Sequence, residues 1–174
     1  LLLGTWRGRI AYYQNAGGSF EKVEEAFVEL ERGSNSTPTL ADIDDDGDLD
    51  LLVGESGGGI HFYRNKGTAK APDFVREKEP LSDVEVAHRS VPELFDVDAD
   101  GDLDLFIGSK DDGLSFYRNT GTKKEPVFKQ EPFPLSINAP KLSSPQFVDF
   151  NADGDFNFIS GSRGGGLIYY RWIQ

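Results

Sequence analysis

The chain has 174 residues, 37 % hydrophobic, with 20 Gly and 9 Pro, a composition that predicts one folded domain of short strands and tight turns. A formal net charge of -12 argues against a broad basic surface for nucleic acid or anionic membranes, and no apolar run could span a bilayer. The chain has no Cys, which excludes disulfides, thiol catalysis and Cys-based zinc sites.

The beginning of the chain is predicted to be the back part of a repeat. Residues 1–18 correspond to the second half of a unit that follows them three more times. A glycine marks the end of the same predicted strand in each unit, at Gly4, Gly54, Gly108 and Gly161, so the repeats are spaced by 50, 54 and 53 residues. The chain also has no Met, so we expect its native start to lie upstream and the sequence to be a fragment or a processed product.

The first complete repeat predicts four short strands, at residues 39–42, 49–54, 59–65 and 73–78. A unit of four strands and about 50 residues is typical of one blade of a β-propeller. The sequence therefore predicts an all-β fold of antiparallel four-stranded blades, in an open arc or partial propeller of about three to four blades.

The blade boundaries follow from the same alignment. We expect a partial first blade at residues 1–36, complete blades at 37–90 and 91–144, and a partial last blade at 145–174. Because propellers close into rings that remove exposed edges, we expect the missing blades to come from a longer parent chain, which we favour, or from a second copy.

Apolar residues alternate with period two along the predicted strands, which indicates half-buried sheets. We expect eight of them to share one face of a sheet and to form the core between blades: Leu51, Val53, Ile60, Phe62, Leu105, Ile107, Leu114 and Phe116.

An Asp-rich loop follows the first strand of each repeat. Its oxygen-bearing side chains stand at positions one, three, five and nine, with Gly at position six and a backbone carbonyl expected from position seven, as in loops that wrap calcium. An Asp-Gly cluster alone is also a good turn, but three loops in register favour metal. The candidate ligands are Asp42, Asp44, Asp46, Asp48, Asp50, Asp96, Asp98, Asp100, Asp102, Asp104, Asp149, Asn151, Asp153, Asp155 and Asn157.

The surroundings of these loops exclude a helical calcium switch. An EF-hand has a bidentate Glu at position twelve and helices on both sides, whereas position twelve here is Val53, Ile107 or Ser160 between strand patterns. We expect about three calcium ions, the weakest at the third loop, where Asn151 and Asn157 replace carboxylates. Crowded carboxylates repel one another, so metal binding and folding should be coupled.

These motifs resemble the FG-GAP and VCBS repeat family over nearly the whole chain. The matching elements are D-x-D-x-D-G-D-x-D in the first two loops, its Asn-substituted form in the third, and the G-x-L/I-x-F/Y-Y-R segments that follow. The Asn-x-Gly-Thr turns at 65–68 and 119–122 look especially like bacterial secreted members. The resemblance implies a calcium-stabilised propeller for adhesion or recognition, as in integrin alpha subunits, bacterial surface proteins and fungal lectins. Since extracellular calcium loops bind at roughly 0.1 to 1 mM, we expect a secreted or cell-surface protein.

The loops between the second and third strands are expected on the rim opposite the calcium loops. Trp6 and Arg7 lie in the first of them and are candidate ligand-binding residues for a protein or a glycan. His61 and His88 have no ligand spacing, and we expect no catalytic or metal role for them. The repeated Arg64, Arg118 and Arg171 are predicted to pair with acidic residues or stack on aromatic rings.

Three functions remain open from the sequence. The leading interpretation is a binding or adhesion module that is not an enzyme, because no Ser-His-Asp arrangement, zinc motif or Gly-rich phosphate loop is present. The alternatives are an architectural repeat of a larger surface protein or filament, and a part of a secreted polysaccharide-acting enzyme. No nucleic-acid partner and no membrane insertion are expected.

Overall fold

The computed structural model describes residues 1–134, 141, 143–149 and 156–171, and these residues form strands joined by turns. Nothing in this part of the chain is a helix of the length and apolar character needed to cross a membrane. The strands are β1 (Leu2–Gly4), β2 (Arg9–Asn15), β3 (Phe20–Glu29), β4 (Thr37–Ala41), β5 (Asp50–Gly54), β6 (Ile60–Asn65), β7 (Phe74–Glu77), β8 (Val91–Phe95), β9 (Asp104–Gly108), β10 (Leu114–Asn119), β11 (Phe128–Glu131), β12 (Ser144–Val148), β13 (Asn157–Gly161) and β14 (Leu167–Arg171).

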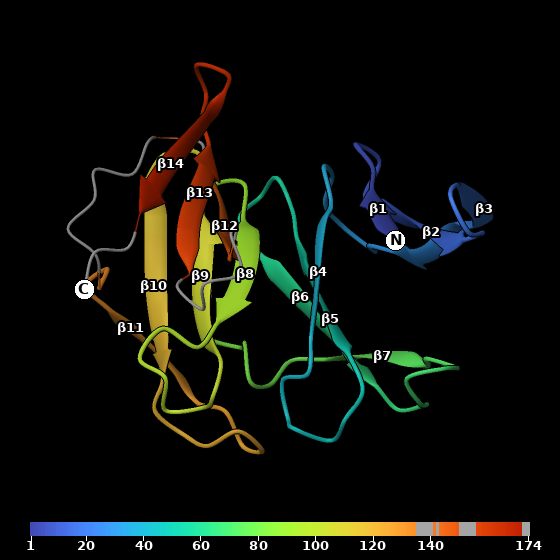
Figure 1. Ribbon diagram of the computed structural model, residues 1–174, viewed down its shortest axis with the longest axis horizontal. Coiled ribbons are helices and arrows are strands. Elements are labelled where there is room, and N and C mark those ends of the chain that lie inside the picture. Colours follow the sequence, from blue (N-terminus) through green and yellow to red (C-terminus); the bar gives the residue numbers. More distant parts are fainter. Residues whose placement is uncertain (135–140, 142, 150–155, 172–174) are drawn as a thin grey trace.

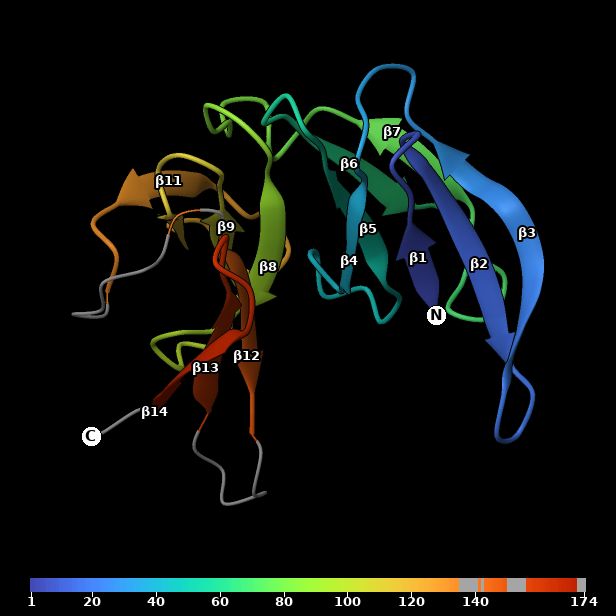
Figure 2. The ribbon, with the colours of Figure 1, turned by 90° about the horizontal axis from the view of Figure 1, so that it is seen from above.

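Four antiparallel sheets follow one another along the chain. Their strand orders are β1-β2-β3, β4-β5-β6-β7, β8-β9-β10-β11 and β12-β13-β14 (Figure 1). Figure 2 shows the sheets standing side by side in an arc, with β1–β3 at one end and β12–β14 at the other. The predicted all-β fold of propeller blades in an open arc is therefore confirmed.

The second sheet is buried on both faces. Leu51 and Val53 pack with Ile10 and Val28 of the first sheet, whereas Leu52 packs in the cluster that contains Leu105 of the third sheet. All five residues of β5 are buried, because each of its faces is covered by a neighbouring blade.

The prediction that the alternating apolar residues share one face is wrong. In the hairpin, Leu51 pairs with Tyr63 and Leu52 with Phe62, so Phe62 lies on the opposite face from Leu51. Six of the eight predicted core residues are buried, with Ile60 and Leu114 half-buried, but they are divided between two faces. The register of the hairpin decides this division.

The third sheet also packs against a neighbouring sheet on each face, and aromatic residues fill its contact with the fourth sheet. Leu105 and Ile107 face the second sheet, while Phe106 lies 4.9 Å from Phe116 and 4.7 Å from Phe147 of β12, centroid to centroid. The stacking of sheets is therefore continued by a row of Phe side chains.

Hydrogen bonds between neighbouring sheets fix their relative positions near the inner strands. The Thr37 hydroxyl donates to the carbonyl of Ser90 at 2.9 Å, and the Thr39 hydroxyl donates to the carbonyl of Pro92 at 2.7 Å. Gly54 lies at the same crossing, where an added Cβ would come within 2.2 Å of the Ser90 carbonyl oxygen. The sheets thus meet too closely for any side chain at Gly54.

Candidate metal centre

The first Asp-rich loop connects β4 to β5 and is closed by its own side chains. Asp42 accepts hydrogen bonds from the backbone N–H groups of Asp46, at 3.1 Å, and Gly47, at 3.0 Å. Asp45 and Gly47 have φ angles of 56° and 94°, a left-handed conformation that favours Asp and Gly. The chain therefore turns sharply around a centre lined by carboxylates.

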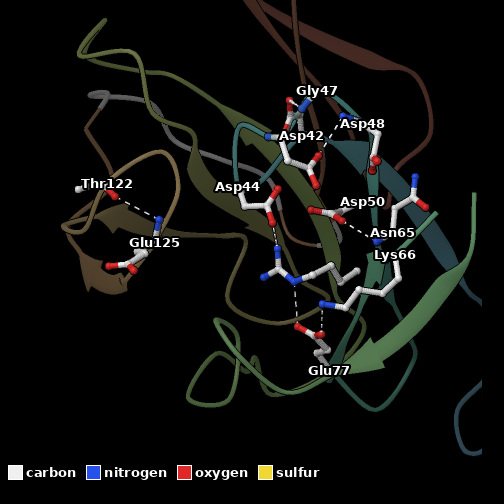
Figure 3. Close-up of polar contacts among 12 residues, drawn as sticks. Asp42, Asp44, Gly47, Asp48, Asp50, Asn65, Lys66, Glu77, Thr122 and Glu125 are labelled. Carbon is white, nitrogen blue, oxygen red and sulfur yellow. Dashed lines mark hydrogen bonds and ion pairs between the residues drawn. The ribbon is translucent and has the colours of Figure 1, made fainter. Parts of the chain in front are cut away.

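Three carboxylates of this loop lie close enough to share one ion. Asp42, Asp44 and Asp46 each offer an oxygen, and these oxygens all lie within 4.8 Å of one another. Figure 3 shows Asp42, Asp44 and Asp50 around one region of the loop. Among the described residues, the buried atoms without a hydrogen-bond partner include Asp44 Oδ1, Asp48 Oδ1 and Asp50 Oδ2, all from this loop.

Asp50 lies beneath the loop at the start of β5 and is only 2 % exposed. Its Oδ1 accepts the backbone N–H of Asn65 at 2.7 Å, and burial raises the pKa of its carboxyl to about 6, although backbone hydrogen bonds from Asn65 and Ile43 partly oppose the rise. A carboxylate this deeply buried is costly unless a cation or a proton compensates its charge. Asp50 is thus a buried oxygen donor next to the three clustered carboxylates.

The second loop, between β8 and β9, has the same construction. Asp96, Asp98 and Asp100 form the second group of carboxylates within 4.8 Å, and Asp96 Oδ1 is buried without a partner. Asp96 also accepts the N–H of Gly101 at 2.9 Å. Asp104 is 2 % exposed, and burial raises the pKa of its carboxyl to about 6.

Position seven of each loop has a further carboxylate. Burial raises the pKa of Asp48, and the charge of neighbouring Asp46 adds to the rise. Burial also raises the pKa of Asp102, with the charge of Asp100 acting in the same direction. The predicted ligand of these residues is the backbone carbonyl, and that assignment stays a prediction.

The third predicted site falls largely outside the described residues. Asn151, Asp153 and Asp155 belong to that undescribed part, so the predicted third ion and its lower affinity stay predictions. Asn157 begins β13 and is 6 % exposed, and its Oδ1 accepts a hydrogen bond from the Tyr169 hydroxyl.

Arg64 and Arg118 pair with acidic residues and lie near aromatic rings, as predicted, and one acidic partner of each belongs to a metal loop. Arg64 Nη1 contacts Asp44 Oδ2, its Nε donates to Glu77 Oε2 at 2.9 Å, and its guanidinium lies 5.2 Å from the Phe62 ring centroid. Glu77 also pairs with Lys66 at 2.8 Å (Figure 3).

Arg118 makes the same contacts in the next blade. It pairs with Asp98 and with Glu131, the latter at 3.0 Å, and lies 5.5 Å from the Phe116 ring centroid. The side chain of Arg171 lies outside the described part. The roles of Glu77 and Glu131 were not predicted from the sequence, although each residue occurs three positions after a repeated Phe.

Trp6 and Arg7 lie in the turn between β1 and β2. Trp6 is 70 % exposed, and the Arg7 guanidinium lies 4.9 Å from its ring centroid. His61 contacts Arg76 at 2.9 Å, and burial together with the Arg76 charge lowers its pKa. His88 contacts Asp111 at 2.9 Å. The structure does not bring the two histidines into the loop carboxylate clusters.

Antiparallel sheets in an open arc, with an Asp-rich loop between the first and second strands of each four-stranded sheet, define a protein built from propeller-type β-repeats. The FG-GAP-like repeat matches residues 1–53 and 96–160, and the chain belongs to this family. No curated protein and no solved structure matches the chain. The two Asp triads are sites that could hold metal ions, as is typical of this family.

Proposed function

We propose that this chain is a calcium-stabilised propeller module that binds a protein or a glycan outside the cell, and that it is not an enzyme. The observation that carries the calcium assignment is the group of Asp42, Asp44 and Asp46, whose oxygens lie within 4.8 Å of one another next to the buried carboxylate of Asp50, with Asp44 Oδ1 buried and without a hydrogen-bond partner. Such a site is costly when empty, so a cation that fills it stabilises the fold.

Calcium suits the donor set better than other ions. All candidate side-chain ligands of the first two loops are carboxylate oxygens, which prefer hard cations over zinc or copper. Magnesium requires a tight octahedron of six ligands, whereas calcium accepts more oxygens in a flexible arrangement, which a wrapped nine-residue loop provides. Asp42, Asp44, Asp46 and Asp50 would hold the first ion, and calcium bound there would supply structural charge compensation.

The extracellular location follows from the expected affinity. Loops of this kind in extracellular modules bind calcium at roughly 0.1 to 1 mM, which resting cytosol cannot supply. A protein whose folding depends on such loops would be stable only where calcium is abundant. Measuring the calcium affinity therefore also tests the proposed location.

The recognition role is supported by the exposed pair at the rim. An indole that is 70 % exposed contributes little to the core, and the Arg7 guanidinium beside it adds a charged group. An aromatic ring with an adjacent cation offers a stacking surface to a sugar or an anchor for a protein. Loops on a rigid scaffold are common places for recognition.

An architectural role is the second candidate, because apolar side chains are exposed at both ends of the arc. Leu3 of the first sheet is 49 % exposed, and Leu167 and Tyr169 of the last sheet are 76 % and 52 % exposed. The residues equivalent to Tyr169 in the two middle sheets, Phe62 and Phe116, are each 1 % exposed because the next sheet covers them. We propose that further blades, from a longer chain or a second copy, cover these faces.

Thermal unfolding in calcium, in magnesium and in excess chelator tests the metal assignment. If each loop binds near ~0.1 mM, ~2 mM calcium adds about 1.8 kcal/mol per loop. We expect a rise in melting temperature that is specific to calcium. The variant Asp46→Asn should reduce the rise, whereas the matched variant Asp45→Asn should not, because Asp45 lies outside the carboxylate triad. An unchanged melting temperature in both metals would refute the proposal.

A screen of glycans and candidate protein ligands in calcium buffer tests the recognition role. Trp6→Ala should weaken binding of any ligand found without changing the melting temperature, because the indole is mostly exposed. A ligand that binds the wild type and Trp6→Ala equally would show that Trp6 is not part of the binding site. Absence of any ligand, together with assembly through the end faces, would favour the architectural role.

A further inference from the structure

We infer that Arg64 and Arg118 are built-in counter-charges of the metal loops, which stabilise the metal-free protein and compete electrostatically with the bound cation. The inference rests on the proposed calcium function and assigns a positioning role to two residues outside the loops. It predicts that replacing either arginine destabilises the metal-free protein and strengthens calcium binding.

The two oxygens of Asp44, at position three of the first loop, have different surroundings. Asp44 Oδ2 contacts Arg64, whereas Asp44 Oδ1 is buried without a partner and lies on the side of the carboxylate that the arginine does not occupy. A cation held by Oδ1 would therefore share this carboxylate with a guanidinium. Two positive groups on one carboxylate repel each other, so each weakens the binding of the other.

Arg64 is fixed in place by contacts outside the loop. Its side chain is 19 % exposed, lies against the ring of Phe62, and donates to Glu77 of the outermost strand at 2.9 Å. Glu77 is in turn held by Lys66 at 2.8 Å. These contacts hold the guanidinium beside Asp44 whether or not a metal is bound, and an arginine does not lose its charge at any ordinary pH.

The third sheet contains an equivalent arginine with equivalent partners. Arg118 contacts Asp98 in the same position of the second loop and Glu131 of β11 at 3.0 Å. It differs in two respects: its side chain is 29 % exposed, and Thr120 stands where the second sheet has Lys66. Because the Arg118 pair is more exposed, water screens it more strongly, and its effect should be smaller.

The test compares Arg64→Gln with the wild type by calcium titration in a calorimeter and by thermal unfolding in chelator. We expect the variant to melt at a lower temperature in chelator, because the loop loses its counter-charge. We expect its first loop to bind calcium about five- to tenfold more tightly, because a nearby positive charge is gone. The calcium-induced rise in melting temperature should therefore be larger than in the wild type.

Glu77→Gln, taken together with Arg64→Gln, separates a counter-charge from a merely structural contact. Glu77→Gln leaves Arg64 with Asp44 as its remaining carboxylate partner, so a counter-charge predicts opposite effects of the two changes: weaker calcium binding in Glu77→Gln and tighter binding in Arg64→Gln. A merely structural contact would weaken calcium binding in both variants. Arg76→Gln is the matched control, because Arg76 of the neighbouring strand contacts Glu31, at 3.2 Å, and His61, at 2.9 Å, neither of which belongs to a metal loop.

The outcomes distinguish this inference from the proposed function. If the wild type shows no calcium effect, the proposed calcium site is wrong. If the wild type binds calcium and Arg64→Gln binds it equally or more weakly, the inference is wrong. Should Arg64→Gln fail to fold, Arg118→Gln on the more exposed pair repeats the test, with a tighter second loop expected and an unchanged or weaker one overturning the inference.

Discussion

The buried carboxylate of Asp50 accepts a hydrogen bond from the backbone N–H of Asn65 at 2.7 Å, and Asp104 accepts one from Asn119 at 2.8 Å. Each bond joins the last ligand position of a metal loop to the end of the third strand in the same blade. The Tyr-Arg-Asn segment therefore supports the metal loop through two neighbouring residues, the arginine side chain and the asparagine backbone.

The first prediction concerns the charge of Asp50. Asp50→Asn should keep an acceptor for the Asn65 N–H but remove a desolvated negative charge whose folded-state pKa is raised to about 6. We expect a higher melting temperature in chelator at pH 7 and a loss of about 1.8 kcal/mol of calcium-induced stabilisation, the contribution of one loop. Unfolding with and without calcium measures both. A variant as calcium-responsive as the wild type would remove Asp50 from the ligand set.

The second prediction concerns the side chain of Asn65. Its Oδ1 accepts the N–H groups of Gly67, at 3.0 Å, and Asp73, at 2.9 Å, and the residue is only 4 % exposed. Asn65→Ala should cost about 1 to 3 kcal/mol, because two N–H groups lose their partner. Asn119→Ala removes the same acceptor in the next blade, where Asn119 Oδ1 accepts the N–H groups of Gly121, at 3.0 Å, and Val127, at 2.9 Å, and should cost a similar amount. Urea unfolding in calcium measures both, and a cost below about 0.5 kcal/mol would contradict the hydrogen-bonding role.

The third prediction concerns the close crossing at Gly54. An added Cβ would lie 2.2 Å from the Ser90 carbonyl oxygen and 2.5 Å from Thr37 Oγ1, so Gly54→Ala should destabilise by about 1 to 3 kcal/mol. The matched change is Gly161→Ala, where the nearest atom is the Ser144 Cβ at 3.5 Å. That variant should stay within about 0.5 kcal/mol of the wild type. Similar denaturation midpoints for both variants would show that neighbouring sheets are not in fixed contact at Gly54.

The fourth prediction concerns pH. Burial raises the pKa of Glu93 on β8 to about 7, although the backbone of Phe147 partly opposes the rise. The folded protein therefore holds this proton more tightly than the unfolded chain, whose pKa is near 4.5. The stability from Glu93 is fully present below about pH 4.5 and is lost as the pH rises through 7.

Glu93→Gln should remove this dependence. The difference in unfolding free energy between wild type and variant should change between pH 4.5 and 7, the variant becoming relatively more stable at the upper end. Denaturant unfolding at a series of pH values, in constant chelator, measures the difference. A difference that stays constant across this range would show that Glu93 is not buried as an acid.

The metal loops and the blades could be predicted because each is formed by a contiguous stretch of sequence that repeats along the chain. A loop that supplies its ligands from its own positions one, three and five needs no distant part of the chain, so Asp42, Asp44 and Asp46 are recognisable from the sequence alone. The repeat of about 50 residues likewise fixes the four-stranded unit, because each unit pairs its own strands.

The tertiary structure alone decided which residues share a face and which charges meet. Alternation places Leu51 and Leu52 on opposite faces, but the hairpin register puts Phe62 with Leu52, and alternation within one strand carries no information about that register. The pairing of Arg64 with Glu77 depends in the same way on the register of β6 with β7, where Phe62 stands opposite Glu77.

The same division applies to burial. The sequence by itself determined the acidic loops, the repeated unit and the strand pattern, because local spacing and repetition specify them. Whether Asp50 is buried and Trp6 is exposed depends on how sheets far apart in the sequence pack, and on which faces another sheet covers. That packing is a property of the assembled arc, since burial arises only when separate blades remove each other's surfaces from water.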